Sequence, residues 1–588
     1  MGKAAGPEVA RLLLEYGRRT ALAGGNPYRA KAYLRAAESL AAQTEPLERL
    51  VKEDRLREIP GVGDAIADII TRLARTGTHP SLEKMRSDIP EGVLDLLAIP
   101  GLRPEKVIKL YKELGVSTLD ELEAAAKEDR IKDVKGLGAA LQRKILQGLA
   151  IRRESQGTRH VHRAGELIAN ATDSLKRSGL AITRIVTAGE FRRASELVVN
   201  LALVAQTASL EDGPKRLTAG EFTIFLTDAK RLGISLLLAT GSEEHLRELE
   251  EIAKAKCLEM TEDGLLKGGK VIASETEEEI YKALGLQFIP PELREGRGEI
   301  ERARAKNLPK LVEAKDLHGI LHAHTDASDG LATLHEMADA VRSRGYQYFG
   351  VTDHSKTAHY AGGLSVEEID SQHAEIDRLN KGYRGKFRIF RGIESDILQD
   401  GSLDYPDEVL RRFDFIVASV HGQFRMERAK QTERILRAVR NPFVTILGHM
   451  TGRQLLRRPG YEVDIEKILK ACAKHGVAVE INSNPWRLDL DWRWYQRGLE
   501  LGCMFSIDPD AHSTTEIDMV RWGVGLARKG GLSREHILNC LDRAAFTKYL
   551  QRRKGLAKPA KGTRPRRVPT QAPRQGIRRH SSGSGVIS

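Results

Sequence analysis

Cysteine is scarce in this sequence: four thiols stand among 588 residues, widely spaced and without a Cys-x-x-Cys pair. We therefore expect neither a disulfide framework nor a thiolate metal site, and reduced buried thiols indicate a cytoplasmic protein. Long apolar runs are also missing, since none approaches the roughly 18 residues that a bilayer span needs. The first ten residues lack the apolar segment of a secretory signal, and position 6 lacks the Ser or Thr of a myristoylation motif. The sequence thus predicts no membrane partner.

Acidic residues are missing from the C-terminal segment 551–588, which holds eleven Lys or Arg. The formal net charge of the chain is +13, so the remaining residues carry only +2. A segment this rich in Pro, Gly, Ser and Arg cannot bury a core, and we expect it to be disordered. Such a cationic arm usually attracts nucleic acid without regard to sequence, and a merely solubilising tail is the alternative.

The length exceeds what one hydrophobic core supports, and ordinary proportions of apolar (41%) and charged (30%) residues indicate three or four globular domains. Before about residue 149, apolar residues recur at three- and four-residue spacing, which predicts short amphipathic helices. From about residue 317, apolar strands alternate with helical stretches, which predicts a parallel α/β sheet or barrel.

Three similar turns in the N-terminal region place glycine just before a predicted helix. Their glycines are Gly61 and Gly63, then Gly101, then Gly136 and Gly138. A turn of this kind exposes backbone N–H groups at a helix N-terminus, where partial positive charge suits a phosphate. The turns resemble the helix-hairpin-helix motif, which binds the DNA backbone without reading bases. The second turn has Arg103 in place of its second glycine, so it binds less well or serves only packing.

The segment 24–40 adds Arg29, Lys31 and Arg35 to these turns. Together they resemble the small N-terminal domain of family X DNA polymerases, which holds the 5′-phosphate side of a DNA gap. In the members with lyase activity, a lysine of the first hairpin forms a Schiff base. Ile69 occupies that position here, so we expect no deoxyribose-phosphate lyase activity by this route.

The region 158–309 resembles the polymerase domain of the same family, most clearly in TAGEFRRASELVVNLALVA from Thr187. Nucleotidyl transfer needs two cations held by carboxylates. The two neighbouring aspartates of the family fall on Asn200 and Ala202, and the third falls on Phe225. Glu190 replaces the serine that contacts phosphate, and its charge would repel a nucleotide triphosphate. We predict that this domain does not polymerise and is a structural or DNA-positioning remnant.

Polar residues follow the predicted strands of the C-terminal half. Loops at the carboxyl ends of parallel strands open on one face, so residues far apart in sequence meet there. A lone histidine at a strand end is more often structural, but recurrence at successive strand ends predicts a metal centre. A His and carboxylate set without thiolate suits Mn²⁺, Zn²⁺ or Fe. The nine candidates are His322, His324, Asp329, His354, Glu394, His421, His449, Asp510 and His512.

These motifs resemble the PHP (polymerase and histidinol phosphatase) domain, a distorted seven-stranded barrel with a trinuclear metal centre, over residues 316–531. The resemblance implies three divalent cations that activate water and neutralise phosphoryl oxygens. It assigns His322, His324, Glu394 and Asp510 to one metal, Glu394, His421 and His449 to a second, and Asp329, His354 and His512 to the third.

The sequence also predicts catalytic and phosphate-contacting residues in and beside these motifs, and for several of them a purely structural role is an equal alternative. Glu394, Asp510 and Arg453 are the predicted catalytic residues, although surface packing is equally open for Arg453. Asn484 and Arg487 contact phosphate or pack at the surface in the same way. Asp353 orients an imidazole or caps a turn.

The order of the regions resembles that of bacterial PolX proteins. The predicted fold is multidomain, α+β and α/β: a helical domain with the first hairpin (1–85), a fingers-like helical domain with two hairpins (86–157), a degenerate palm and thumb (158–309), a PHP phosphoesterase domain (310–550) and the basic tail (551–588). The resemblance implies a nucleoid-associated cytoplasmic enzyme, a monomer rather than an oligomer, that acts on gapped or 3′-recessed DNA. It would remove 3′ nucleotides or 3′-phosphates during base excision repair. A small-molecule phosphatase of the histidinol-phosphatase type and a non-catalytic DNA scaffold remain as alternatives.

Overall fold

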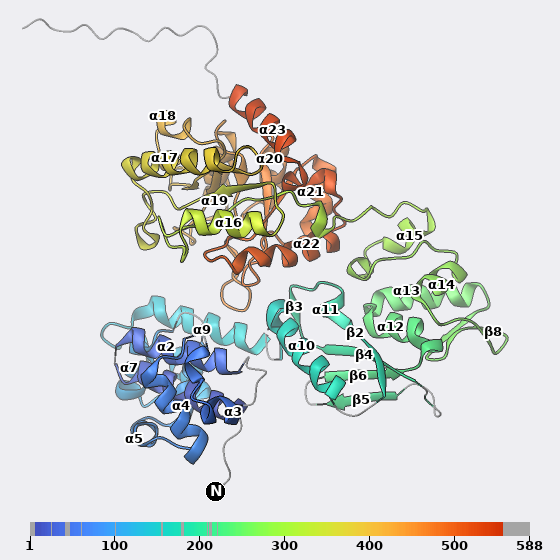
Figure 1. Cartoon of the computed structure of the whole chain (residues 1–588), viewed down its shortest axis with the longest axis horizontal. Helices are drawn as coiled ribbons and strands as arrows, with labels where there is room; N and C mark the ends of the chain where they lie inside the picture. Colours follow the sequence, from blue (N-terminus) through green and yellow to red (C-terminus); the bar gives the residue numbers. More distant parts are fainter. Residues whose placement is uncertain are drawn as a thin grey trace, which may run out of the picture.

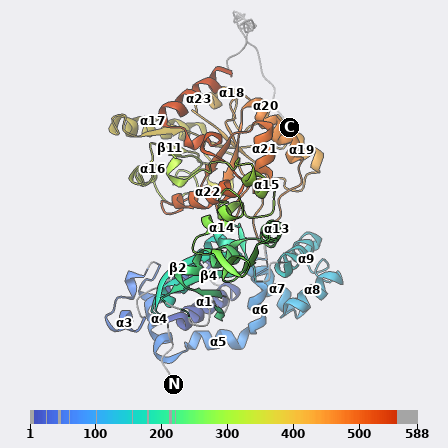
Figure 2. The same cartoon turned by 90° about the vertical axis from the view of Figure 1, so that its right-hand side faces the viewer.

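The computed structural model describes residues 6–24, 26–41, 47–59, 61–99, 102–154, 157–177, 181–208, 210, 215–219 and 222–556. Figures 1 and 2 show a barrel at one end of the molecule, with a helical region and a palm-like sheet side by side at the other end. None of the described helices is long and apolar enough to cross a membrane.

The N-terminal region is entirely helical, as its spacing of apolar residues predicts. Its helices bury two separate apolar clusters, one centred on α1 and α4 and one on α6 to α9. Gly61 has φ +83° and Gly136 has φ +84°, so both turns use the left-handed backbone that glycine favours. The helices are α1 (Gly6–Leu22), α2 (Pro27–Ala41), α3 (Leu47–Lys52), α4 (Asp64–Thr76), α5 (Pro80–Asp88), α6 (Glu91–Leu96), α7 (Pro104–Leu114), α8 (Leu119–Lys127) and α9 (Gly138–Glu154).

The palm is a four-stranded sheet in the order β2-β4-β6-β5. Apolar clusters fix α10 to one face of the sheet and α12 to the other. The thumb follows, with four helices, of which α12 also covers the palm sheet, and an antiparallel three-stranded sheet. The palm elements are β1 (Arg159–His160), α10 (Val161–Arg177), β2 (Ile182–Ala188), α11 (Gly189–Arg192), β3 (Leu197–Val198), β4 (Leu201–Thr207), β5 (Lys215–Ala219) and β6 (Phe222–Thr227). The thumb elements are α12 (Leu232–Thr240), α13 (Glu243–Ala255), β7 (Glu259–Thr261), β8 (Gly264–Lys267), β9 (Lys270–Ala273), α14 (Glu277–Ala283) and α15 (Glu299–Arg304).

The C-terminal region is a ring of parallel strands. The sheets β10-β11-β12 and β13-β14-β15-β16-β17 are parallel throughout. Since β12 and β13 are two successive segments of a single interrupted strand, the eight labelled strands occupy seven strand positions in the ring. Parallel bridges from Ala323 to Ala511 and from His354 to Glu394 join the two sheets at both seams. The predicted seven-stranded barrel is therefore confirmed, and its carboxyl ends converge on one rim.

The barrel strands are short and their connections are mostly helical. The strands are β10 (Gly319–Ile320), β11 (Tyr348–Val351), β12 (Arg388–Arg391), β13 (Glu394–Asp396), β14 (Val417–Ser419), β15 (Ile446–Leu447), β16 (Ala478–Asn482) and β17 (Phe505–Asp508). The helices are α16 (Leu334–Ser343), α17 (Val366–Gly382), α18 (Asp407–Leu410), α19 (Arg428–Arg440), α20 (Ile465–His475), α21 (Tyr495–Leu501), α22 (Val520–Lys529) and α23 (Arg543–Leu556).

The helix α23 extends beyond the predicted start of the basic tail. Its side chain Arg553 is buried and donates hydrogen bonds to the carbonyl oxygens of His475 (2.5 Å) and Gly476 (2.7 Å) at the end of α20. This cationic residue therefore serves as a cap for a neighbouring helix. The predicted tail from residue 557 onward lies outside the described residues.

The barrel and the palm are joined by buried charges. Lys529, at the end of α22, is 5% exposed, pairs with Glu295 and donates to the carbonyl oxygen of Arg193 at 2.9 Å. Arg528 donates to Glu292 of the thumb region at 2.7 Å, in a partly exposed pair. Pairs of this kind fix a relative orientation rather than add much net stability, so the palm and thumb are docked in one orientation on the barrel.

Removal of the Phe546 ring should destabilise the barrel selectively. Phe546 is fully buried and stacks on Tyr348, with ring centroids 4.8 Å apart, so Phe546→Ala should lower the free energy of unfolding by about 3–5 kcal/mol. All four tryptophans lie between residues 486 and 522, so their fluorescence during urea unfolding reports on the barrel. Lys548→Ala on the same helix is the exposed control, and an equal loss in both variants would contradict this packing.

Candidate metal centre

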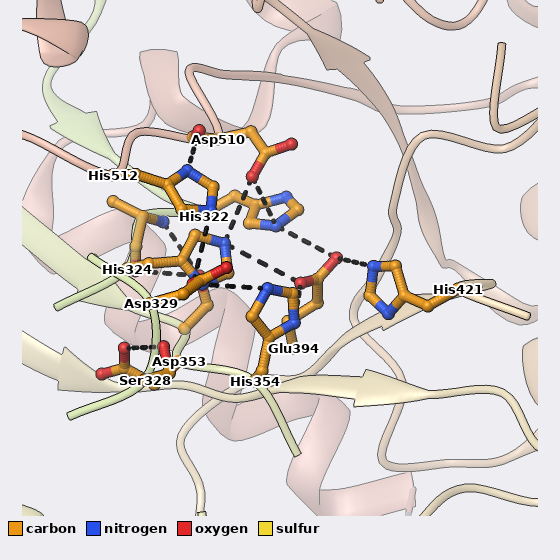
Figure 3. Close-up of polar contacts among 12 residues, drawn as sticks. His322, His324, Ser328, Asp329, Asp353, His354, Glu394, His421, Asp510 and His512 are labelled. Carbon is orange, nitrogen blue, oxygen red and sulfur yellow. Dashed lines mark hydrogen bonds and ion pairs between the residues drawn. The ribbon is translucent and has the colours of Figure 1, made fainter. Parts of the chain in front are cut away.

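The nine candidate ligands lie together at the carboxyl rim of the barrel, as Figure 3 shows for most of them. His322 and His324 follow β10, His354 follows β11, and Glu394 begins β13. The remaining strand ends supply the other ligands: His421 follows β14, His449 follows β15, Asp510 and His512 follow β17, and Asp329 lies in the loop after β10. The strand-end pattern therefore brings together residues separated by up to 190 positions.

Two of these residues have strained backbones. His322 has φ +55° and Asp510 has φ +52°, in the left-handed region that residues other than glycine rarely occupy. Strain of this kind costs about 1–3 kcal/mol and persists where neighbouring contacts hold it. Both side chains are directed into the centre by this backbone geometry (Figure 3).

Glu394 lies at the middle of the cluster and is 1% exposed. Its Oε1 atom lies 3.0 Å from Nε2 of His449 and 3.2 Å from Nε2 of both His322 and His421. Its Oε2 atom lies 2.9 Å from Nδ1 of His354. The one carboxylate thus contacts two groups of imidazoles with separate oxygens, which is the geometry that a bridging ligand needs.

Two further carboxylates gather the rest of the imidazoles. The Oδ1 atom of Asp510 lies 3.2 Å from Nε2 of His324. The Oδ1 atom of Asp329 lies 3.4 Å from Nε2 of His512 and 3.6 Å from Nε2 of His354. Four overlapping groups result, and within each group the ligand atoms lie within 4.8 Å of one another: His324 with Asp329, His354 and His512; His322 with His324 and Asp510; His322 with Glu394 and His449; and His354 with Glu394 and His421.

The chemistry of the cluster fits divalent cations. Nε2 of His322, Nδ1 of His324, Nδ1 of His354 and Oε2 of Glu394 are buried and form no hydrogen bond of good geometry with the described residues, although Nδ1 of His354 and Oε2 of Glu394 lie 2.9 Å apart. Unsatisfied buried polar atoms are rare in folded proteins, and a bound ion is one of their few explanations. Six imidazoles and three carboxylates form a mixed N and O donor set of the kind that Mn²⁺, Zn²⁺ and Fe accept.

Electrostatics within the cluster favour charged imidazoles in the metal-free protein. Burial alone would lower the pKa of His354, but the carboxylates of Glu394 and Asp329 raise that pKa to about 10. The same balance raises the pKa of His421 and of His512 to about 9. Burial would likewise raise the pKa of Glu394, yet its imidazole neighbours hold it well below the usual range.

A second set of residues, which the sequence prediction missed, orients the ligands. Glu480 of β16 is fully buried, accepts from Nδ1 of His322 and accepts from the backbone N–H of His449. Asp396 accepts from Nδ1 of His421 at 2.5 Å. Such carboxylates fix the ring orientation and tautomer of a ligating histidine. In the sequence, Glu480 could have been recognised as the one acidic residue within the apolar strand VAVEIN.

Asp353 does not orient an imidazole. It anchors the loop in which Asp329 lies. Its carboxylate accepts from Thr325 N–H and Thr325 Oγ1 at 2.7 Å, from Ser328 Oγ at 2.5 Å and from Gln372 Nε2 at 2.7 Å. Of the two interpretations from sequence, turn capping is therefore the one that the contacts support.

Arg453 differs from its prediction as a catalytic residue. Its guanidinium is directed away from the nine ligands, since it donates to the carbonyl oxygens of Arg487 (3.0 Å) and Leu488 and pairs with Asp491 and with Glu196 of the palm. It positions the loop in which Arg487 lies. Arg487 itself reaches the centre, with Nε 3.4 Å from Oδ2 of Asp510. Asn484 accepts from the backbone N–H of Trp486 and so shapes the same loop.

The palm positions have no metal-binding geometry. Ala202 is buried in an apolar cluster with Leu232 and Leu236 of α12, and Phe225 packs against that cluster. Asn200 is exposed, and its backbone N–H donates to Oε2 of Glu190 at 3.0 Å. The carboxylate of Glu190 thus occupies backbone donors beside the turn where the sequence predicts a phosphate contact.

The predicted DNA-binding residues lie at the surface of the helical region. Arg29, Lys31 and Arg35 of α2 are exposed. The turn at Gly61 packs beside Arg35, because a Cβ on this glycine would lie 3.8 Å from the Cβ of Arg35. Gly63 precedes α4, Gly136 precedes α9, and Gly138 is the first residue of α9. Ile69 is buried in the core, and Gly101 lies outside the described residues.

Comparisons with known proteins match each region separately. Family models match a helix-hairpin-helix domain over residues 5–79, a helix-hairpin-helix tandem over 93–150, a DNA polymerase beta thumb over 235–295 and a PHP domain over 321–484. The chain is 32% identical over 574 residues to the DNA polymerase/3′–5′ exonuclease PolX of Bacillus subtilis (strain 168), which covers 93% of this chain and 99% of that protein. It is 27% identical over 252 residues to a probable phosphatase of Thermoanaerobacter sp. (strain X514), which covers 40% of this chain and 94% of that protein.

Metal uptake at neutral pH should release protons. The imidazoles of His354, His421 and His512 are protonated at pH 7 in the metal-free protein, because their pKa values are raised to about 9–10, and ligation requires neutral imidazoles. Affinity for Mn²⁺ should therefore rise as the pH increases from 7 to 9. Calorimetry at pH 7.5 in buffers of different ionisation enthalpy should give net release of more than about one proton per chain. Release of none would contradict the charged cluster.

Proposed function

Because the chain belongs to the PolX family of DNA polymerases with a C-terminal PHP domain, we propose that its barrel centre hydrolyses phosphoesters at the 3′ ends of DNA. The observation that carries this proposal is the convergence of six imidazoles and three carboxylates on one rim. The PolX of Bacillus subtilis has a 3′–5′ exonuclease in its name, and it aligns with nearly the whole of this chain. The reaction is either exonucleolytic or the removal of a 3′-phosphate.

We assign three divalent cations to the nine ligands, with Glu394 as the bridge. Mn²⁺ and Zn²⁺ suit the donor set best, and Fe is the third candidate. When bound, such cations activate water and stabilise the charge that develops on phosphoryl oxygens. Arg487, which lies at the edge of the centre beside Asp510, adds a guanidinium that can bind a phosphate with two parallel hydrogen bonds.

The substrate is DNA rather than a small ester because of what surrounds the centre. Helix-hairpin-helix regions and a polymerase thumb indicate DNA binding. A small-molecule phosphatase would have no use for either. Tyr360 is 72% exposed and lies at the rim, with its ring 6.2 Å from that of His354. An exposed ring at that place offers a base a stacking surface. Gapped or 3′-recessed DNA bound by a monomer is the form that we propose.

The polymerase activity of the family is lost in this chain, in our proposal. Nucleotidyl transfer requires carboxylates that hold two cations, and Asn200, Ala202 and Phe225 supply none. The apolar packing of Ala202 against α12 supports the same conclusion. The palm then serves to dock the helical region on the barrel and to position Arg453 through Glu196.

Removal of two ligands should abolish the hydrolysis of 3′ ends. We expect the purified protein with Mn²⁺ to shorten 3′-recessed and gapped DNA, and His322→Ala plus His324→Ala to lower that rate by about 100-fold or more. His335→Ala is the matched control, because His335 is exposed on α16 and outside the centre. Equal degradation by all three proteins would contradict the proposal.

Two additional measurements separate the alternatives. Faster hydrolysis of histidinol phosphate than of 3′-labelled DNA at matched metal would favour the small-molecule phosphatase. Fewer than about one transition metal per chain in the purified protein would favour a non-catalytic scaffold.

A further inference from the structure

A large groove separates the barrel from the second helical hairpin region. Its volume is about 1420 Å³. One wall is formed by three barrel loops, represented by Phe424, Arg457 and Trp486. The opposite wall is formed by Ile99 and Leu102, which flank the second glycine turn, and by Lys144 of α9. In Figure 1, α9 is the helix of this region that lies nearest to the barrel.

The groove leads from the rim that carries the metal centre. Its barrel loops follow β14, β15 and β16, and each of these loops begins at or near a residue of the centre. Gln423 stands two residues after His421, and Trp486 directly precedes Arg487, which contacts Asp510. None of the nine ligands lines the groove itself, so a chain that lay in it would pass along these loops toward the metal ligands.

Cations predominate along the groove. The lining contains two carboxylates, Glu427 and Glu462, and five cationic side chains: Lys144, Arg425, Arg428, Arg457 and Arg458. Glu427 is within 3.8 Å of Lys430, whereas none of the five cations has an ion pair within the described part of the chain. Partial burial lowers the pKa of Arg457, and no carboxylate compensates it. Unpaired guanidiniums at a concave surface are typical of sites that bind phosphate.

Two of these arginines lie over aromatic rings. The guanidinium carbon of Arg457 is 4.0 Å from the centre of the Trp486 ring, and that of Arg458 is 4.2 Å from the centre of the Phe424 ring. His160 of the palm packs on Trp486 at 4.1 Å, and Tyr461 stacks on Phe424 at 6.0 Å. The rings hold the guanidiniums at the groove wall without neutralising them. Cations interleaved with aromatic rings are the surface on which unpaired nucleotides bind.

We propose that this groove binds the single-stranded 3′ segment of a DNA substrate and delivers its end to the metal centre. The proposal rests on the proposed function and names the form of DNA that the centre takes. The phosphates would face Arg425 and Arg428, and the bases would lie against the guanidinium planes of Arg457 and Arg458 that cover the rings. The second hairpin region forms the opposite wall through Ile99, Leu102 and Lys144.

The test compares two full-length variants that lose equal charge. Arg425→Gln plus Arg457→Gln removes two of the five cations of the groove. Arg411→Gln plus Lys548→Gln is the control, because neither residue lines the groove. Like the groove arginine Arg457, Arg411 lies over an aromatic ring, with its guanidinium carbon 5.4 Å from the centre of the Phe443 ring. Affinities for a fluorescent duplex with a 3′ single-stranded overhang and for the same duplex with blunt ends are measured in EDTA, where no hydrolysis occurs. Turnover of bis(p-nitrophenyl) phosphate with Mn²⁺ reports on the metal centre alone.

We expect the groove variant to bind the overhang duplex about 10-fold more weakly, with a salt dependence that falls by about 1.4 in slope for two lost phosphate contacts. The blunt duplex and the small ester should be unaffected, and the control should match the wild type throughout. Unchanged affinity for the overhang, or an equal loss for overhang and blunt duplex, would overturn the single-strand assignment. If the wild type hydrolyses no ester but the groove variant still loses affinity, the proposed function fails and the groove proposal stands.

Discussion

The structure depends on one arrangement above all: the buried carboxylate of Glu394 between two groups of imidazoles. Six histidines converge on three carboxylates, and several of their buried donor atoms lack a partner in the described chain. Burial of so many polar atoms is costly unless ions satisfy them. The supporting contacts of the barrel serve this centre, since Glu480, Asp396 and Asp353 hold the ligand rings and loops in place. The strained backbones of His322 and Asp510 are part of this arrangement, because both residues are candidate ligands of the centre.

The other regions of the chain position DNA and the barrel relative to one another. The thumb region docks on the barrel through ion pairs of Lys529 and Arg528, and the palm docks through the Arg193 carbonyl oxygen, which accepts from Lys529, and through Glu196, which reaches Arg453 of the ligand loops. The loops after β14, β15 and β16 connect the metal centre to a cationic groove beside the helical hairpins. The palm thus has a physical role in the fold, because these contacts hold it against the barrel.

Sequence alone predicts the barrel and the nine candidate ligands, because strand ends are marked by apolar runs and because His and carboxylate types recur there. It does not identify Glu480, since one acid within a strand does not reveal which way it faces. It also does not reveal the direction of Arg453, which donates to the carbonyl oxygens of Arg487 and Leu488 and pairs with Asp491, with Glu196 of the palm as a more distant partner. Arg487 and Arg453 look alike in sequence, and only the folded loops of the barrel rim distinguish them. The groove is likewise invisible, because its two walls belong to different domains.

We propose that the working catalytic centre is the one in the barrel and that the palm has none. The most direct measurement follows a 3′-hydroxyl primer on gapped DNA with Mn²⁺ and all four deoxynucleoside triphosphates. We expect the wild-type protein to shorten the primer, and loss of both His322 and His324 to leave its length unchanged. Template-directed lengthening that persists without these two histidines would contradict this proposal.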